Sequence, residues 1–300
     1  MEKSDLNEWF KAGSIASESL EFGKRLLVPG ANVLDVALRI EDFIFKKGAK
    51  PGFPVQISIN DIAAHYTPFP DDHTIINEGD VIKLDLGAHI NGFIGDTALT
   101  VEIKSNNYSD LIKASKEALD AAIKLCKPET KVCEIGESVN NVISNYGFSP
   151  IRNLSGHRID KYILHSDLGI PNYNNNDKTK LWDGLVIAIE PFATNGDGLV
   201  KEGKRSSNYR WPGTTKIPRD SNTRDVLKFI KEEFNTLPFA KRYLVKKFPL
   251  PKINFALLTL LKDEILYEYP QLPEKSGGIV SQHEHTILVG DKPKIITKHD

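Results

Sequence analysis

The sequence predicts an α+β fold, in which an antiparallel sheet is covered by helices. Two observations point to it: a helical segment that recurs after 99 residues, and an apolar strand that recurs after 105. The chain has 300 residues, of which 40% are hydrophobic and 26% charged, so it can bury a sizeable core. We therefore expect one large duplicated domain, with or without an insertion.

The helical repeat reads PGANVLDVALRIEDFIFKKGA from Pro29 and PETKVCEIGESVNNVISNYGF from Pro128. Apolar residues of the two copies match at helical spacing, and Gly48 and Gly147 stand where each helix would stop. Another helical pattern precedes each copy, in 6–27 and in 109–126.

The strand repeat matches GDVIKLD, which ends at Asp85, with GLVIAIE, which ends at Glu190. Either repeat alone could arise by chance, because any two helices share a similar apolar spacing and any two buried strands share a similar apolar run. Both repeats occur in the same order and at similar offsets, which favours a duplicated helix–helix–strand unit.

The region 195–270 has no counterpart in the first half of the chain. Helical patterns at 223–234 and 253–267 flank the proline-containing segment LPFAKRYLVKKFPLPK. A final strand at 278–290 resumes the apolar pattern. We therefore expect three parts: a main domain that starts at 1–194, an inserted helical subdomain at 195–270, and the final strands of the main domain at 271–300.

The net charge of −1 argues against a uniformly basic nucleic-acid binder, but opposite charges are segregated along the chain. Residues 201–250 contain 13 Lys and Arg against 5 Asp and Glu. This stretch is either an ordinary solvated helical face or a contact for ribosomal RNA. The side chains expected in such a contact are Lys241, Arg242, Lys246 and Lys247.

The N-terminal residues lack an apolar signal region, and no apolar run approaches the length of a membrane span. Cys126 and Cys133 cannot form a disulfide framework. These features favour a cytoplasmic protein.

Two acids occupy a predicted hairpin, VIKLDLGAHINGFIGDTALTV, with Asn91-Gly92 at its turn. This register places Asp85 opposite Ala98, so Asp85 and Asp96 are diagonal neighbours on one face. Diagonal neighbours lie roughly 7–8 Å apart, which suits two carboxylates that share a metal pair. An isolated aspartate is more often an ordinary exposed acid.

Three further polar residues interrupt apolar strands or glycine-marked turns: His157, Glu190 and Glu284. Acids that end buried apolar runs are costly unless they are paired, and a metal is one way to pair them. An oxygen-rich site with one imidazole suits Mn, Fe(II), Co or Zn.

The order of these five residues resembles the dinuclear site of methionine aminopeptidases, on the pita-bread fold that prolidases share. Six local strings carry the resemblance: AAHYTP, LDLG, GDTALTV, SGH, AIEPFAT and QHEHTILV. The insertion is similar to the helical subdomain of the type 2 enzymes. A long charged N-terminal extension, typical of eukaryotic members, is missing, so the archaeal type is the closer match.

The resemblance implies roles for the five donors around two divalent ions. Asp85 would chelate one ion, Asp96 and Glu284 would bridge both, and His157 and Glu190 would complete the other. His283, beside Glu284, departs from the family pattern, and strand alternation points it away from the site.

The resemblance also implies substrate contacts. His65 and His165 match two histidines that contact the scissile amide without binding metal, and Phe53, Leu164 and Tyr269 match the methionine pocket. Taken alone, a single histidine is usually structural, and buried apolar residues usually serve packing.

The implied function is removal of the initiator methionine from new polypeptides, with Glu190 moving the proton of the attacking water. His165 would stabilise the oxyanion, and His65 would bond the amide nitrogen or help to protonate the leaving amine. We expect a monomer that binds no DNA and no membrane. A prolidase or aminopeptidase P is the enzymatic alternative. A metal-free pita-bread protein that binds RNA or ribosomes is the non-catalytic one, although competent donors at all five positions argue against it.

Overall fold

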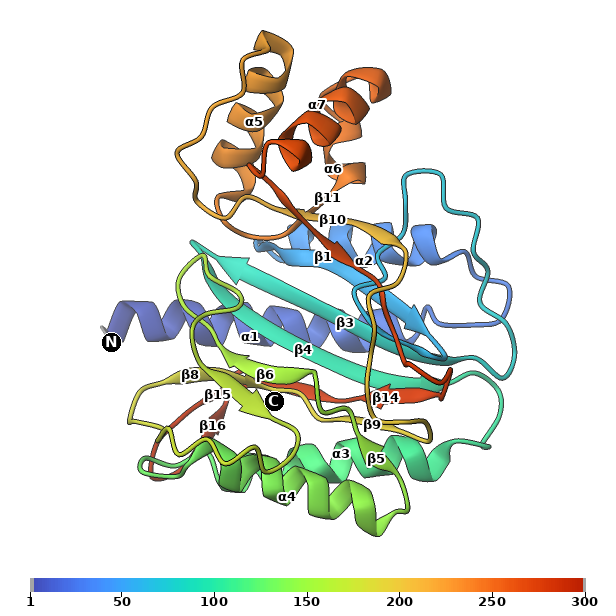
Figure 1. Cartoon of the computed structure of the whole chain (residues 1–300), viewed down its shortest axis with the longest axis vertical. Helices are drawn as coiled ribbons and strands as arrows, with labels where there is room; N and C mark the ends of the chain where they lie inside the picture. The colour runs from blue at the N-terminus through green and yellow to red at the C-terminus, as the bar shows by residue number, and fades with distance from the viewer. Residues whose placement is uncertain (1–2, 299–300) are drawn as a thin grey trace.

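The computed structural model describes residues 3–298, in which a curved antiparallel sheet is the central element (Figure 1). The helices are α1 (Lys3–Lys24), α2 (Val33–Lys46), α3 (Ser109–Lys124), α4 (Val132–Asn145), α5 (Ser221–Phe234), α6 (Lys241–Val245) and α7 (Leu250–Lys262). The strands of the main sheet are β1 (Lys50–Ile59), β3 (Val81–Ile90), β4 (Phe93–Glu102), β6 (Ser155–Arg158), β7 (Gly169–Pro171), β8 (Val186–Ile189), β15 (Glu284–Leu288) and β16 (Lys294–Ile295).

The main sheet has the order β1-β3-β4-β15-β8-β6-β7, and β16 pairs with β15. Smaller sheets join β2 (Ile62–Ala64) to β13 (Leu272–Pro273), and β5 (Ser149–Pro150) and β14 (Val280–Gln282) to β9 (Phe192–Thr194). The pairing of β4 with β15 links the two halves of the main sheet, so strands that are distant in sequence meet at its centre.

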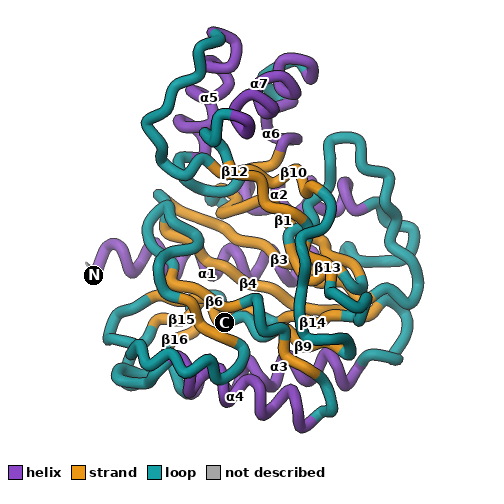
Figure 2. Tube along the Cα trace, viewed as in Figure 1, coloured by secondary structure: helices purple, strands orange, loops and turns teal. Residues whose placement is uncertain are grey.

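Two helix pairs cover the sheet, as Figure 2 shows, and each pair packs on its own half. Residues of α1 and α2 share an apolar cluster with β1, β3 and β4. Residues of α3 and α4 share a second cluster with strands of the other half. Helix α1 lies directly on β4. The approach is so close that a Cβ atom on Gly95 would stand only 2.5 Å from the Cα of Gly13.

The duplicated unit predicted from the sequence is confirmed. Helices α2 and α4 each span 14 residues, and each is followed by a left-handed glycine, Gly48 at φ 83° and Gly147 at φ 81°. The predicted hairpin is confirmed too, since β3 and β4 pair Asp85 with Ala98. Its turn residues Asn91 and Gly92 have φ of 51° and 90°, as a two-residue hairpin turn requires.

The segment 195–270 contains the helices α5, α6 and α7 around their own apolar cluster. It also contains a small sheet of β10 (Arg205–Arg210), β11 (Phe239–Ala240) and β12 (Tyr267–Pro270), which the sequence did not indicate. Strand β10 has the sequence RSSNYR, which shows no apolar alternation. In Figure 1 this part rises above the main sheet.

Three sequence expectations are corrected. The helix expected over 253–267 ends at Lys262, because Glu264 adopts a left-handed φ of 55° and the chain then enters β12. The single final strand is two strands, since at His283 the chain leaves its partner β9 and joins β4 and β8. Arg242 is not part of a basic surface: it is 5% exposed and forms an ion pair with Glu41.

Cys126 and Cys133 are both free and buried. Among residues 3–298, every helix is too short or too polar to cross a membrane.

Candidate active site and metal centre

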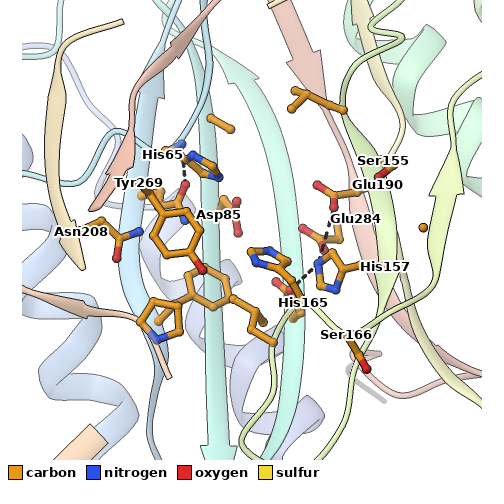
Figure 3. A pocket seen from close by; sticks show the side chains of 18 of the residues that line it. His65, Asp85, Ser155, His157, His165, Ser166, Glu190, Asn208, Tyr269 and Glu284 are labelled. Carbon is orange, nitrogen blue, oxygen red and sulfur yellow. Dashed lines mark hydrogen bonds and ion pairs between the residues drawn. The ribbon is translucent and has the colours of Figure 1, made fainter. Parts of the chain in front are cut away.

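A cavity of about 410 Å³ opens on the face of the main sheet that carries the predicted acids (Figure 3). Its walls include all ten residues singled out from the sequence: Phe53, His65, Asp85, Asp96, His157, Leu164, His165, Glu190, Tyr269 and Glu284. These residues come from both halves of the chain and from β12, so folding brings together positions that lie up to about 230 residues apart.

Strand register aligns three of the acids in one row across the sheet. Asp85 on β3 pairs with Ala98 on β4, and Ala98 pairs with Glu284 on β15. Glu190 follows β8 directly, and its neighbour Ile189 pairs with the residue after Glu284. Glu190 therefore continues the row. The small side chain of Ala98 leaves room between the acids on either side of it.

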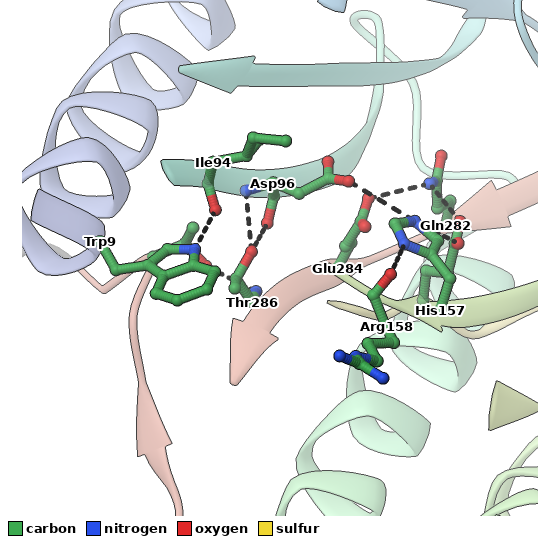
Figure 4. Close-up of polar contacts among 10 residues, drawn as sticks. Trp9, Ile94, Asp96, His157, Arg158, Gln282, Glu284 and Thr286 are labelled. Atoms are coloured by element: carbon green, nitrogen blue, oxygen red, sulfur yellow. Dashed lines mark hydrogen bonds and ion pairs between the residues drawn. The ribbon is translucent and has the colours of Figure 1, made fainter. Parts of the chain in front are cut away.

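A parallel row carries Asp96 and His157. The hydroxyl of Thr286 accepts a hydrogen bond from the Asp96 amide at 2.8 Å and donates one to the Asp96 carbonyl at 2.8 Å (Figure 4). Thr286 pairs with Ala188, and Ala188 pairs with His157. This row is two residues away from the first along each strand, so the side chains of both rows share one face.

The donor atoms converge within a few ångströms. One atom each from Asp96, His157 and Glu284 lie within 4.8 Å of one another. His157 Nε2 stands 3.6 Å from an oxygen of Asp96 and 3.6 Å from an oxygen of Glu190. Within the described part of the chain, one oxygen of Asp85 and one of Asp96 are buried without any hydrogen-bond partner. Such unpartnered buried oxygens are what a cation would satisfy, so this donor set fits divalent metal ions.

The electrostatics of the cluster agree with that fit. Burial raises the pKa of Asp85 to about 7. Burial, and then repulsion from the other carboxylates, raises the pKa of Asp96, Glu190 and Glu284 well above the ordinary range. Ionised acids packed this tightly need positive charge beside them, and bound cations supply it.

His65 has a hydrogen-bond arrangement that sets its tautomer. It follows β2 with a left-handed φ of 70°, and its amide donates to Gln56 Oε1 at 2.7 Å. Its Nδ1 lies 3.1 Å from the Pro270 carbonyl oxygen. Because a carbonyl only accepts, Nδ1 carries the proton and Nε2 is left as an acceptor. Burial lowers the pKa of His65 to about 4, so the ring is neutral at pH 7.

His165 lies beside the donors, with its ring centroid 4.4 Å from that of His157 and 6.0 Å from that of Tyr269. Figure 3 shows its ring between Tyr269 and His157. His165 is exposed towards the cavity, and desolvation among its neighbours, followed by the nearby positive groups, lowers its pKa well below its usual value. The ring is therefore neutral at pH 7.

Gln282 and Asn208 are among the polar residues of the site that the sequence reasoning missed. Gln282 Nε2 donates to Glu284 at 3.4 Å and to Glu190 at 3.5 Å, which orients both carboxylates. A signal for it existed, since it precedes Glu284 by two residues and so shares a face with it in the strand predicted over 278–290. Asn208 lines the cavity with a buried oxygen that has no partner among the described residues, but the sequence of its strand β10 shows no apolar pattern.

His283 points away from the cavity, as expected. Its Nδ1 contacts the hydroxyl of Ser115 on α3 at 2.8 Å.

Fold and site together define a class of protein. Four carboxylates and one imidazole converge on one face of a duplicated antiparallel sheet, beside two neutral histidines. This arrangement is that of a metal-dependent hydrolase with the pita-bread fold. Residues 9–290 match the model of metallopeptidase family M24, and the chain belongs to this family.

Relatives agree over nearly the full length of the chain. A protein of Pyrococcus abyssi named methionine aminopeptidase is 43% identical over 294 residues, which covers 98% of this chain and 99% of the relative. A protein of the same name from Methanocaldococcus jannaschii is 42% identical over 297 residues, 99% of both chains.

Solved structures show the same fold at low sequence identity. A thermophilic Arx1 matches with a TM-score of 0.88 at 19% identity, over 99% of this chain and 91% of the other. Methionine aminopeptidase from Thermotoga maritima matches with a TM-score of 0.71 at 22% identity, over 100% of this chain and 98% of the other. Prolidase from Pyrococcus furiosus matches with a TM-score of 0.62 at 20% identity, but this chain covers only 65% of it.

Proposed function

We propose that this protein is a methionine aminopeptidase, which hydrolyses the first peptide bond of new polypeptides and releases the initiator methionine. The proposal is carried by the 43% sequence identity, over 98% of this chain, to an archaeal relative of that name. The cavity supports it, since the five donors and both histidines line one space.

Two divalent ions are the proposed cofactors, held by Asp85, Asp96, His157, Glu190 and Glu284. When bound, such ions polarise a carbonyl and lower the pKa of water, which provides a nucleophile near neutral pH. Oxygen donors with one imidazole accept Co, Mn, Fe(II) or Zn, and availability in the cell decides among them.

Glu190 is the proposed proton carrier. Gln282 donates to its Oε2, and its Oε1 lies towards His157 inside the cavity. From this position its carboxylate can take a proton from the attacking water and pass it to the leaving amine.

The two neutral histidines act on the scissile amide. His65 Nε2, as an acceptor, receives a hydrogen bond from the peptide N–H of the substrate. With a pKa of about 4, the ring carries no second proton at pH 7 that it could give to the leaving amine. His165 donates to the oxygen on which negative charge develops.

Phe53, Leu164 and Tyr269 form the proposed pocket for the methionine side chain. All three are buried at the cavity wall, with exposed fractions of 2%, 5% and 8%. An apolar pocket of this kind accepts an unbranched thioether. The free amine of the substrate would lie near Asp85, which restricts cleavage to N-termini.

A peptide panel tests the function. With Co or Mn present, Met-Ala-Ser is expected to be cleaved after Met, while Gly-Pro is left intact. Cleavage of Gly-Pro alone would contradict the proposal in favour of a prolidase. Absence of turnover with every metal would instead favour a non-catalytic protein.

We also propose that the insertion contacts ribosomal RNA, in the cytoplasm and as a monomer. Lys246 and Lys247 are exposed and Lys241 is half-buried, within a segment that carries a basic excess of eight. Arg242 is not part of this proposed contact, because it is buried and paired with Glu41. Lysines that neutralise RNA phosphates release counterions, so the affinity of such a contact falls as the salt concentration rises.

Co-sedimentation with ribosomes measures this contact. Changing Lys241, Lys246 and Lys247 to Gln is expected to weaken it and to flatten its salt dependence. The control changes three exposed lysines of α3, Lys113, Lys116 and Lys124, to Gln, and should bind as the wild type does. Equal binding by both variants would exclude the contact.

A further inference from the structure

A buried ion pair joins the insertion to the main domain. Glu41 on α2 is 4% exposed and Arg242 on α6 is 5% exposed. Arg242 Nη2 donates to one oxygen of Glu41, and its Nε donates to the other at 3.3 Å. The hydroxyl of Tyr243 also donates to Glu41, at 2.6 Å. The carboxylate is thus held in one place from several directions.

Arg242 also reaches the segment that follows His65. Its Nη1 donates to Thr67 Oγ1 at 2.7 Å and to the Pro68 carbonyl at 3.0 Å. The Thr67 hydroxyl in turn donates to the Val55 carbonyl at 2.8 Å. A left-handed conformation at a residue other than glycine, as at His65, persists only when its surroundings impose it. The guanidinium of Arg242 is part of those surroundings.

The insertion touches the segment that carries His165 as well. The Thr236 hydroxyl, between α5 and β11, donates to the Tyr162 carbonyl at 2.5 Å. Tyr162 also has a left-handed φ, of 60°, and its amide donates to the Gly92 carbonyl at 2.8 Å. His165 follows three residues later, so Thr236 anchors the start of its loop.

A third contact comes from β12, which pairs with β10 of the insertion. The Tyr269 ring lies 5.2 Å from that of His65 and 6.0 Å from that of His165. The next carbonyl, of Pro270, accepts from His65. Three separate contacts of the inserted part thus lead to the same two histidines, whereas strands of the main sheet hold the metal donors.

We propose that Arg242, with Glu41 and Thr236, are positioning residues through which the insertion sets His65 and His165 over the scissile amide. The inference rests on the proposed function, which assigns both histidines to catalysis. A shift of about 1 Å in such a group can cost roughly 10²-fold in rate. The donors lie on other elements, so metal affinity should not change.

Steady-state kinetics distinguish contacts that position His65 and His165 from contacts that only attach the insertion to the main domain. Arg242→Met, Thr67→Val and Thr236→Val are expected to lower kcat on Met-Ala-Ser roughly 10- to 100-fold, with KM and metal affinity within about twofold of wild type. The two valine variants keep the buried ion pair intact, so they report even where Arg242→Met does not fold. The control, Glu233→Gln, removes the exposed Lys50–Glu233 pair, which joins the same two parts at 2.8 Å. It should leave kcat unchanged.

Histidine ring signals in NMR spectra of the metal-free protein give a readout that needs no turnover. Thr67→Val should shift the ring signals of His65, Thr236→Val should shift those of His165, and His283 should stay in place as the internal reference. Unmoved signals of His65 and His165, or an unchanged kcat in folded variants, would overturn the inference. Absence of turnover in the wild type would contradict the proposed function instead. The ring signals would then still test whether the insertion positions His65 and His165.

Discussion

Asp85→Ala is expected to reduce turnover of Met-Ala-Ser to background, by roughly 10³-fold or more. Asp85 is the donor from β3, and one of its oxygens is buried without a partner among residues 3–298. Removing it deletes a ligand, and metal ions contribute several kcal/mol of transition-state stabilisation, each ~1.4 kcal/mol being tenfold in rate. Calorimetric titration with Mn(II) should show lower affinity or fewer bound ions.

Asp42→Ala is the matched control for this substitution. Asp42 lies on the surface of α2, where it pairs with Lys46, and its loss should change neither metal binding nor activity. If Asp85→Ala kept wild-type activity in metal-replete buffer, Asp85 would have no place among the ligands.

His165→Ala is expected to lower kcat by about 10²–10³-fold while KM stays within a few-fold. This is the usual cost of deleting one donor that stabilises an oxyanion. The neutral ring stands 4.4 Å from His157, at the edge of the donor cluster rather than within it. Metal stoichiometry, measured on the purified variant, should therefore equal that of the wild type.

His283→Ala provides the comparison for a half-buried histidine outside the cavity. Its ring contacts Ser115 on the far side of β15, so kcat should be unaffected in the folded protein. A drop in metal content in His165→Ala, as large as its drop in kcat, would contradict its role as a non-ligand and make it part of the metal site.

The sequence was sufficient for the part of the site that lies on one hairpin. The turn signal at Asn91-Gly92 sets the register, and register alone places Asp85 and Asp96 on one face. The duplicated helices were also predictable, because apolar spacing and a final glycine repeat in both copies. These are local features, which depend on few neighbours.

Residues whose role depends on distant contacts could not be predicted in the same way. Arg242 lies in a run of basic residues, and only the fold brings Glu41 to it from 201 residues away. Asn208 lies on a short polar strand that is recognisable only beside β11 and β12. His157 was predicted from its polarity beside a glycine and from the family resemblance, since no local register connects it to Asp85. Glu190 was indicated as well by the strand repeat, which aligns it with Asp85.

The central claim is that five side chains hold two divalent ions in the cavity, and diffraction at the manganese absorption edge tests it most directly. Crystals grown with Mn(II) should show two anomalous peaks, both within ligand distance of Asp85, Asp96, His157, Glu190 and Glu284. A cavity without a peak, or peaks bound only by residues outside this set, would contradict the account.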